Sequence, residues 1–338
     1  MQEINFTNPL LEFAGLPAVA DALKNGQTFL VTSHQRPDGD AVGSVLGLAQ
    51  SLIKDRKKVD IGFADQIGEN FSFLVNQTPL KPGMIKENYY DYVISLDCGD
   101  LPRTGFEEDF SKYRNKLINI DHHISNNLFG SINLLDANAS STCEIVLFLL
   151  LYCDLPLNSE IAECLYLGLV TDGRFFQNES MRYTAHVAGA VLLNAGLKTN
   201  QILSSLTSRR SIPELKVLGM GLGKIQTDLD GKLASVLITA ADIAQCNAVC
   251  DHVWSCGLFN QITSLKGVIV GFTVVENGEG VSFCEFRSKS GFDVKEIAVA
   301  LGGGGHLAAS GCHQPIPANE LYQKAMKLIR EKLSSFNS

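Results

Sequence analysis

Short apolar runs alternate with helix-like segments along the first 200 residues of the chain. The runs rich in β-branched and apolar residues predict four strands, at Thr28–Thr32, Val59–Phe63, Tyr92–Leu96 and Lys116–Ile120. Apolar positions at helical spacing predict four helices, over Ala41–Ile53, Ser141–Cys153, Ser159–Val170 and Met181–Asn194. Strands that alternate with helices are typical of a mostly parallel α/β sheet with helices on both faces. Ligands of such sheets bind at the carboxyl ends of the strands.

The pattern changes after residue 221. It predicts strands at Lys232–Thr239, Val268–Val275 and Val281–Arg287, and helices over Val294–Leu301 and Asn319–Leu333. The segment 276–280 (ENGEG) predicts a hairpin turn, and Thr239 with Asp242 could cap a helix that begins near Ala240. We therefore expect a first α/β domain over residues 1–195, a partly helical linker over 196–221, and a smaller α/β domain over 222–338.

Composition places the chain among ordinary globular proteins. Of its 338 residues 45% are hydrophobic and 19% are charged. The longest apolar run, Ile145–Cys153, is far shorter than the roughly 20 residues of a membrane span. The first residues lack a basic stretch followed by an apolar one, so we expect no signal peptide and a cytoplasmic protein without membrane contact. The nine cysteines form no CxxC pair, which favours buried, reduced thiols.

The formal net charge of −8 limits the partners of the protein. Gripping a long nucleic-acid duplex through its phosphates requires many cationic side chains, so this charge argues against that mode of binding. A short anionic substrate remains compatible with it. Metal ions that balance acidic ligands are also compatible.

Acidic residues and histidines follow the predicted strands. His34, Asp38 and Asp40 come after the first strand, and the third strand ends in Asp97 with Asp100 close behind. The last of the four strands runs into Asp121, His122 and His123, and a helix runs into Asp172. Each aspartate taken singly could be a turn or cap residue. Gathered at one edge of one sheet they would repel one another, and a bound cation resolves that repulsion.

The donor types indicate which metal fits. Carboxylates and imidazoles without thiolates suit manganese, magnesium or iron better than structural zinc. Four aspartates could balance two divalent ions, and a bridging carboxylate would hold these roughly 3.5–4 Å apart. Such a pair activates water for in-line attack at phosphorus.

Four ordered motifs, HQRPDGDAVGS, SLDCGD, NIDHHISN and LVTDGRF, resemble those of the DHH phosphoesterases. The resemblance implies two divalent metal ions, with manganese expected. The ligands that it implies for the first ion are His34, Asp38 and Asp97, and those for the second are Asp40, Asp97, His122 and Asp172. It also implies that His123 faces the scissile phosphate, or alternatively only donates a supporting hydrogen bond, and that Asp121 orients a neighbouring histidine. The fourth motif departs from the family's usual TDTGxF by being one residue shorter.

A run of four glycines ends in His306. Its backbone N–H groups could converge on an anion, and we expect His306 at the start of a following helix. A flexible turn is the alternative. The stretch GGGGHLAASG resembles the signature of the DHH-associated C-terminal domain, which implies a substrate-binding set of Arg287, Ser288, Gly303, Gly304, Gly305 and His306. Arg287 could instead form an ion pair with Glu285 or Glu296, and Ser310 and His313 are lesser substrate candidates.

Domain pairing and length resemble the nanoRNase/pAp phosphatase group of the family (NrnA-type). The resemblance implies hydrolysis of very short oligonucleotides, of linear dinucleotides such as pApA, and of 3′-phosphoadenosine 5′-phosphate (pAp), in a cleft between the two domains. An inorganic pyrophosphatase or exopolyphosphatase is the closest alternative, although no dense run of Lys and Arg lies near residues 285–313. A processive single-strand exonuclease is a third enzyme class. A nucleotide sensor that binds without cleaving is the alternative from another class, and a homodimer is compatible with each.

Overall fold

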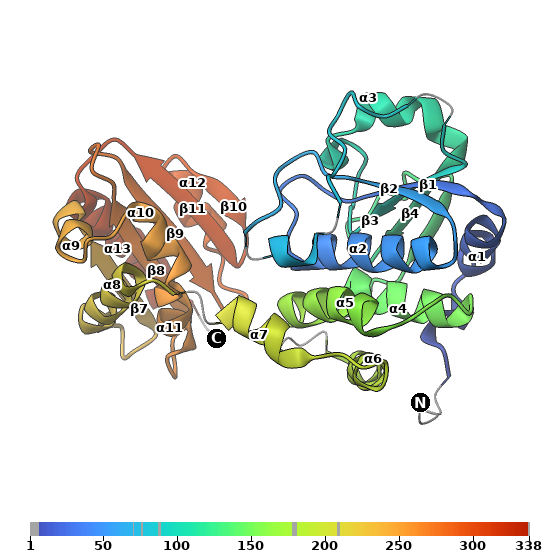
Figure 1. The fold of residues 1–338 in the computed structure, drawn as a ribbon. Helices are drawn as coiled ribbons and strands as arrows, with labels where there is room; N and C mark the ends of the chain where they lie inside the picture. Colours follow the sequence, from blue (N-terminus) through green and yellow to red (C-terminus); the bar gives the residue numbers. More distant parts are fainter. Residues whose placement is uncertain are drawn as a thin grey trace. The chain divides into compact units, whose positions relative to one another are not determined.

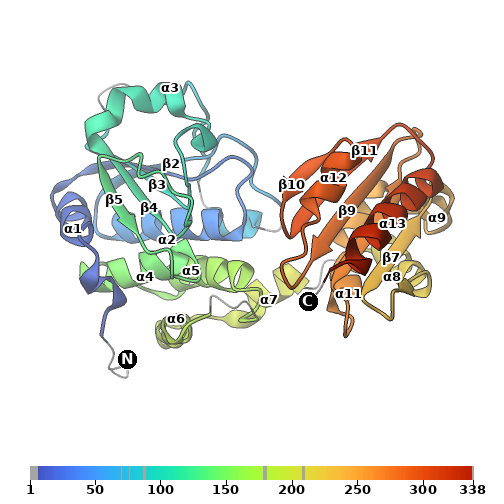
Figure 2. The same ribbon diagram turned by 180° about the vertical axis from the view of Figure 1, so that it is seen from behind.

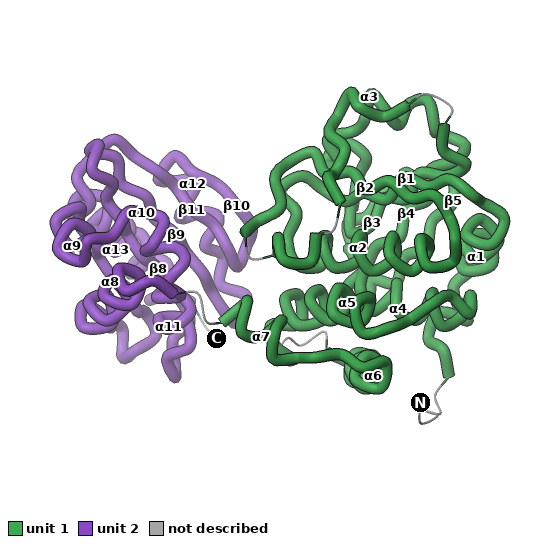
Figure 3. The backbone as a smooth tube through the Cα atoms, in the orientation of Figure 1, with its two compact units in different colours: residues 1–208 green, residues 209–338 purple. Residues whose placement is uncertain are grey.

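A computed structural model describes residues 7–69, 71–75, 77–86, 89–177, 181–207 and 210–336. The chain divides into two units, residues 1–208 and 209–338 (Figure 3). The segment expected as a linker contains helices α7 (Thr199–Thr207) and α8 (Ile212–Gly223), while residues 208 and 209 lie outside the described part. Among the described residues, every helix is too short or too polar to traverse a bilayer.

The first unit is built on a five-stranded sheet in the order β2-β1-β3-β4-β5 (Figure 1). The strands are β1 (Thr28–Thr32), β2 (Lys58–Gly62), β3 (Tyr92–Leu96), β4 (Leu117–Asp121) and β5 (Ile132–Leu135). All four pairings between neighbours are parallel, which confirms the predicted fold class. The edge strand β5 was not predicted, because it is short and only one of its residues is fully buried.

Helices cover both faces of this sheet. The α-helices of the unit besides α7 are α1 (Leu16–Asn25), α2 (Gly39–Lys54), α3 (Glu107–Phe110), α4 (Thr142–Tyr152), α5 (Ser159–Asp172) and α6 (Tyr183–Asn194), and its 3-10 turns are η1 (Pro9–Glu12), η2 (Ser72–Leu74), η3 (Pro102–Thr104) and η4 (Ser111–Lys116). Successive side chains of β1 alternate between two hydrophobic clusters. Phe29 and Val31 join the larger cluster with α1, α2, α4 and α5, and Leu30 joins the smaller one beside α3 and η4.

Helices α2 and α5 pack closely because glycines recur every four residues along α2. A Cβ atom at Gly43 would lie 2.4 Å from the carbonyl oxygen of Cys164, and one at Gly47 would lie 2.5 Å from Leu165. Only hydrogen fits at these positions, so the backbones approach each other directly. This contact brings the start of α2 beside the end of α5.

The second unit contains a six-stranded mixed sheet in the order β10-β11-β9-β8-β7-β6 (Figure 2). Its strands are β6 (Gln226–Asp228), β7 (Leu233–Ile238), β8 (Val270–Glu276), β9 (Ser282–Ser288), β10 (Gly304–His306) and β11 (Ala309–Gln314), and its helices besides α8 are α9 (Ala240–Gln245), α10 (Cys250–Ser255), α11 (Leu258–Ser264), α12 (Lys295–Ala300) and α13 (Ala318–Ser334). The predicted β8–β9 hairpin is present, and Thr239 caps α9 in a capping box with Asp242. Helices α12 and α13 pack on one face of the sheet, and α8 to α11 on the other.

The position predicted for His306 at the start of a helix is wrong. His306 ends strand β10, which pairs antiparallel with β11. Gly302 and Gly305 have φ angles of +76° and +137°, which a helix does not allow, so the glycine run ends α12 and turns the chain into an edge hairpin. A Cβ atom at Gly303 would lie 2.1 Å from the carbonyl oxygen of Gly311, which shows how closely the hairpin strand lies against its neighbour.

Candidate metal centre

The loop after β1 presents one carboxylate to a helix and another to the interior. Asp38 is the N-cap of α2, and its Oδ1 accepts hydrogen bonds of 3.0 Å from the backbone N–H groups of Asp40 and Ala41. Asp38 and not Asp40 therefore caps this helix. The Asp38 side chain stays 58% exposed, whereas Asp40 in the first turn is 1% exposed.

The N-terminus of α4 holds the buried Asp40. Its Oδ2 accepts from the backbone N–H of Thr142 at 2.6 Å, and its Oδ1 accepts from that of Cys143 at 2.9 Å. The Thr142 hydroxyl donates to Asp97 Oδ1 at 3.1 Å. Sequence reasoning missed Thr142. The sequence feature that points to it is Ser141-x-x-Glu144, a pattern typical of a helix start. The Ser141 side chain accepts a hydrogen bond from the Glu144 N–H, so the first turn of α4 begins at Thr142, where its free N–H groups meet Asp40.

Asp97, directly after β3, lies between two histidines. Its Oδ2 is 3.5 Å from His34 Nε2, and its Oδ1 is 3.5 Å from His122 Nε2. The backbone of Asp97 has a φ of +54°, in the left-handed region that non-glycine residues rarely adopt. Such strain clusters at functional sites. The side chain is 2% exposed and presents one oxygen to each histidine.

The six residues predicted as metal ligands lie together. Two groups have ligand atoms that all lie within 4.8 Å of one another, and these are His34, Asp38 and Asp97, and Asp40, His122 and Asp172. A third such group joins Asp97 and His122 to His123. Asp97 and His122 thus link the groups into one cluster at the carboxyl edge of the sheet.

Both ligand histidines have their second ring nitrogen engaged. His34 Nδ1 lies 2.7 Å from the carbonyl oxygen of Gln35, and His122 Nδ1 lies 3.3 Å from that of Ala139. A carbonyl accepts only from N–H, so Nδ1 is the donor in both contacts and Nε2 is the ring nitrogen that faces the carboxylates. Metal-binding histidines are held in this way.

Asp121 ends β4 and orients the neighbouring imidazole. It is fully buried, and its Oδ1 accepts from His123 Nδ1 at 2.8 Å. Its Oδ2 accepts from Asn126 Nδ2 at 2.6 Å, a partner that sequence reasoning did not assign. Burial alone would raise the pKa of Asp121, but the bonds from His123 and Asn126 hold it below its usual value. The bond to Asp121 raises the pKa of His123 to about 8.

Part of the chain matches a known protein family, and similar proteins are known over most of its length. Residues 28–169 match the model of the DHH family, N-terminal domain. The bifunctional oligoribonuclease and PAP phosphatase NrnA of Thermus thermophilus is 28% identical over 328 residues, which cover 94% of this chain and 94% of that protein. An exopolyphosphatase-related protein from Bacteroides fragilis, 23% identical, has a TM-score of 0.79 and covers 98% of this chain and all of its own. The exonuclease RecJ bound to manganese has a TM-score of 0.54 at 14% identity, covering 97% of this chain and 96% of its own. These two structures bear on the fold alone.

The carboxylates of the first unit crowd one another. Burial raises the pKa of Asp40 well above its usual value, and the charges of Asp97 and Asp172 raise it further. Burial also raises the pKa of Asp172 to about 6, with a contribution from Asp97 and against the influence of His122. Carboxylates that destabilise each other's charge, together with neighbouring imidazoles, form the donor set that a divalent cation stabilises. The residues therefore fit a metal ion.

The short fourth motif changes the chain just after Asp172. This aspartate is the last residue of α5, and the three residues that follow Gly173 have φ angles between +46° and +64°. These are Arg174, Phe175 and Phe176, in a left-handed turn. Asp172 nonetheless lies 3.3 Å from His122 Nε2, so the shorter loop still brings its carboxylate to the cluster. Asp100 does not join the cluster, and its Oδ1 accepts from the backbone N–H of Arg103.

The predicted substrate residues lie in the second unit. The Arg287 guanidinium stacks on Phe259 at 5.2 Å and lies 3.7 Å from Glu285, so the ion pair considered as an alternative is present in a loose form. The Ser288 hydroxyl donates to the carbonyl oxygen of Phe292 and thereby fixes its own loop. His306 is exposed in the edge strand beside the glycine run.

Proposed function

We propose that the chain is a metal-dependent phosphoesterase that hydrolyses short oligonucleotides, linear dinucleotides such as pApA, and pAp to mononucleotides. The observation that carries this proposal is Asp97, whose two oxygens face two separate imidazoles at the centre of the carboxylate cluster. A bridging carboxylate of this kind is what a two-metal phosphoesterase requires. The NrnA relative supplies the substrate class.

Six side chains would hold two divalent ions in the DHH domain, and we expect manganese. The first ion would take His34, Asp38 and Asp97, and the second Asp40, Asp97, His122 and Asp172. When bound, such ions lower the pKa of water and stabilise charge on a phosphoryl group. The protein contributes by holding these ligand atoms in position before an ion binds.

His123 is the side chain that we propose to act on the phosphate. Its Nδ1–H donates to Asp121, so Nε2 is left to contact a phosphate oxygen or to give a proton to the leaving oxygen. The side chain is 34% exposed, and a substrate can reach it. Asp121, held in turn by Asn126, acts only through the orientation of this ring.

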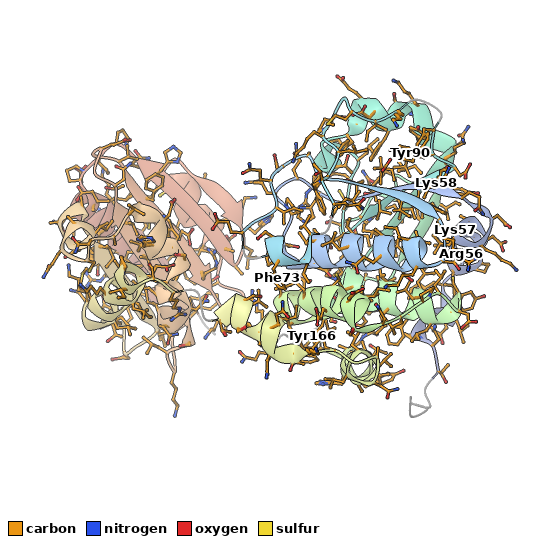
Figure 4. The ribbon with its side chains drawn as sticks, viewed as in Figure 1. Arg56, Lys57, Lys58, Phe73, Tyr90 and Tyr166 are labelled. Atoms are coloured by element: carbon orange, nitrogen blue, oxygen red, sulfur yellow. The ribbon has the colours of Figure 1, made fainter. Side chains whose placement is uncertain are left out.

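Arg287, the glycine run 303–305 and His306 would bind the far end of the nucleotide. A guanidinium recognises phosphate through paired N–H donors, and glycines let backbone N–H groups approach an anion. The basic triplet Arg56, Lys57 and Lys58 cannot serve the metal centre, because it lies at the amino end of β2, away from the ligand edge (Figure 4). This triplet therefore does not extend the site toward a longer, more highly charged substrate.

Product analysis with manganese tests the proposal. The full chain is offered pApA, pAp, a 24-mer RNA and pyrophosphate, and AMP is expected from the first two with little attack on the 24-mer. Asp97→Asn should abolish turnover. Asp100→Asn is the matched control, since it lies on the same edge outside the cluster and an asparagine retains the cap on Arg103. Phosphate released from pyrophosphate alone would make the chain a pyrophosphatase, and tight pApA binding without turnover would make it a sensor.

A further inference from the structure

A bare strip of backbone crosses the outer strands of the second sheet. Strands β9, β11 and β10 lie side by side at this edge of the sheet (Figure 2). Glu285 of β9 pairs with Gly311 of β11, which pairs with Gly304 of β10. Because Gly311 and Gly304 have no side chains, Glu285 is the one residue of these three that carries a side chain. A Cβ atom at Gly304 would meet nothing within 4 Å, so the space above it is open.

An aromatic group borders one side of the strip. Phe283 and His313 are cross-strand partners two residues along, with ring centroids 6.0 Å apart and planes inclined by 31°. Trp254 of α10 lines the same cavity of about 480 Å³, together with the glycines of the strip. Phe283 and Trp254 are only half-buried and His313 is exposed, so part of each of these side chains is accessible where it lines the cavity.

A guanidinium and an imidazole border the other side. Arg287 pairs with Ala309, which pairs with His306, so these two substrate candidates lie in the row beyond the strip on the same face of the sheet. Arg287 lies four positions from Phe283 along β9, which corresponds to about 14 Å of strand. The face therefore offers a cationic end, a flat floor and an aromatic end in that order.

We infer that the cavity lined by Trp254, Phe283 and His313 binds the purine base of a nucleotide whose phosphate contacts Arg287. This inference rests on the proposed function and names the part of the substrate that the second unit recognises. A flat glycine floor admits a planar base, and aromatic rings bind it by stacking. The volume lies within the usual range for a small-molecule site. Glu285 at the end of the floor accepts a hydrogen bond from an amino group of the base.

Trp254 provides a direct test because it is the only tryptophan of the chain. The full chain is titrated with AMP in EDTA, where no metal-dependent turnover occurs, and in parallel with ribose 5-phosphate and inorganic phosphate. AMP should quench the tryptophan fluorescence saturably, and the two ligands without a base should not. Equal quenching by ribose 5-phosphate, or absence of AMP binding by calorimetry, would overturn the inference. The readout is independent of hydrolysis, so failure of the proposed function would be recognised separately.

Two variants extend the test to turnover. Trp254→Leu should raise the KM for pAp about tenfold with kcat unchanged, and Trp254→Phe should restore most of the affinity. Gly304→Val should also raise KM, and it should fold normally because its side chain enters open space. Phe336→Leu is the matched control, since Phe336 packs on Phe292 outside this cavity. An unchanged KM in both Trp254→Leu and Gly304→Val would contradict the assignment.

Discussion

Replacing Gly168 by alanine should displace the Asp40 side chain and thereby disturb the candidate metal centre. Gly168 lies in α5, where a Cβ atom would come within 2.3 Å of Asp40 Oδ1 and within 2.3 Å of Cys143 Sγ. It would also lie 2.9 Å from the Asp40 Cα atom, whereas ordinary van der Waals contact begins at 3.4 Å. Neither neighbour can rotate away, because two backbone N–H groups of α4 hold the Asp40 carboxylate and Cys143 is buried.

Two opposing effects set the magnitude. Alanine favours a helix over glycine by about 1 kcal/mol. Overpacking of a rigid core costs roughly 1–3 kcal/mol, and the three close contacts point to the upper end. We therefore expect a net loss of about 2 kcal/mol, or roughly 4–8 °C in the Tm of a unit of this size. Because Asp40 must shift, manganese affinity should also fall at least about tenfold.

Calorimetry with and without manganese measures both effects. Gly219→Ala is the control, since Gly219 is a helical glycine of α8 whose Cβ would meet nothing within 4 Å. That variant should keep or slightly raise stability and leave metal affinity unchanged. If Gly168→Ala matched Gly219→Ala in both Tm and manganese affinity, the packing argument for Asp40 would be wrong.

Three further predictions follow from the same structure. Manganese at 100 times its Kd should stabilise the wild type by about 2.7 kcal/mol in thermal unfolding but leave Asp97→Asn unchanged, and equal shifts in both would place the ion elsewhere. Asn126→Ala removes a donor from Asp121 and should lower kcat roughly tenfold at unchanged manganese affinity, as measured by steady-state kinetics and calorimetry; a loss of manganese affinity instead would indicate a structural role. Burial raises the pKa of Asp242, but the ion pair with Lys224 and the hydrogen bonds from Thr239 together outweigh this and keep the pKa below the usual value. The stabilisation by Asp242 is thus present above about pH 4 and lost as the pH falls through the folded-state pKa, so urea unfolding should show Asp242→Asn less stable than wild type by up to about 1 kcal/mol at pH 7, with the difference closing in acid.

The sequence predicted the positions of the clustered residues well because a parallel sheet brings all its strand ends to one edge. His34, Asp97 and His122 follow three different strands, and that topology alone predicts that they meet. The Ser141-x-x-Glu144 cap indicates where α4 begins, but not that its first turn binds Asp40, because Thr142 lies 102 residues away from Asp40 in the chain. The prediction for His306 was wrong because it assumed that the glycine run precedes a helix. The positive φ of Gly305 instead turns the chain into a hairpin. The catalytic and binding roles of these residues stay predictions.

In this cluster, the orientation of the Asp40 carboxylate and the stabilisation of its charge have different causes. Its carboxylate accepts two backbone N–H groups at the N-terminus of α4, an arrangement that favours a negative charge. Its pKa nevertheless lies well above the usual value, because burial and the charges of Asp97 and Asp172 outweigh those bonds. The helix therefore fixes where the oxygens point without stabilising their charge fully. The remaining charge is what a divalent cation would balance, so a ligand set held in place beforehand needs little rearrangement when it binds one.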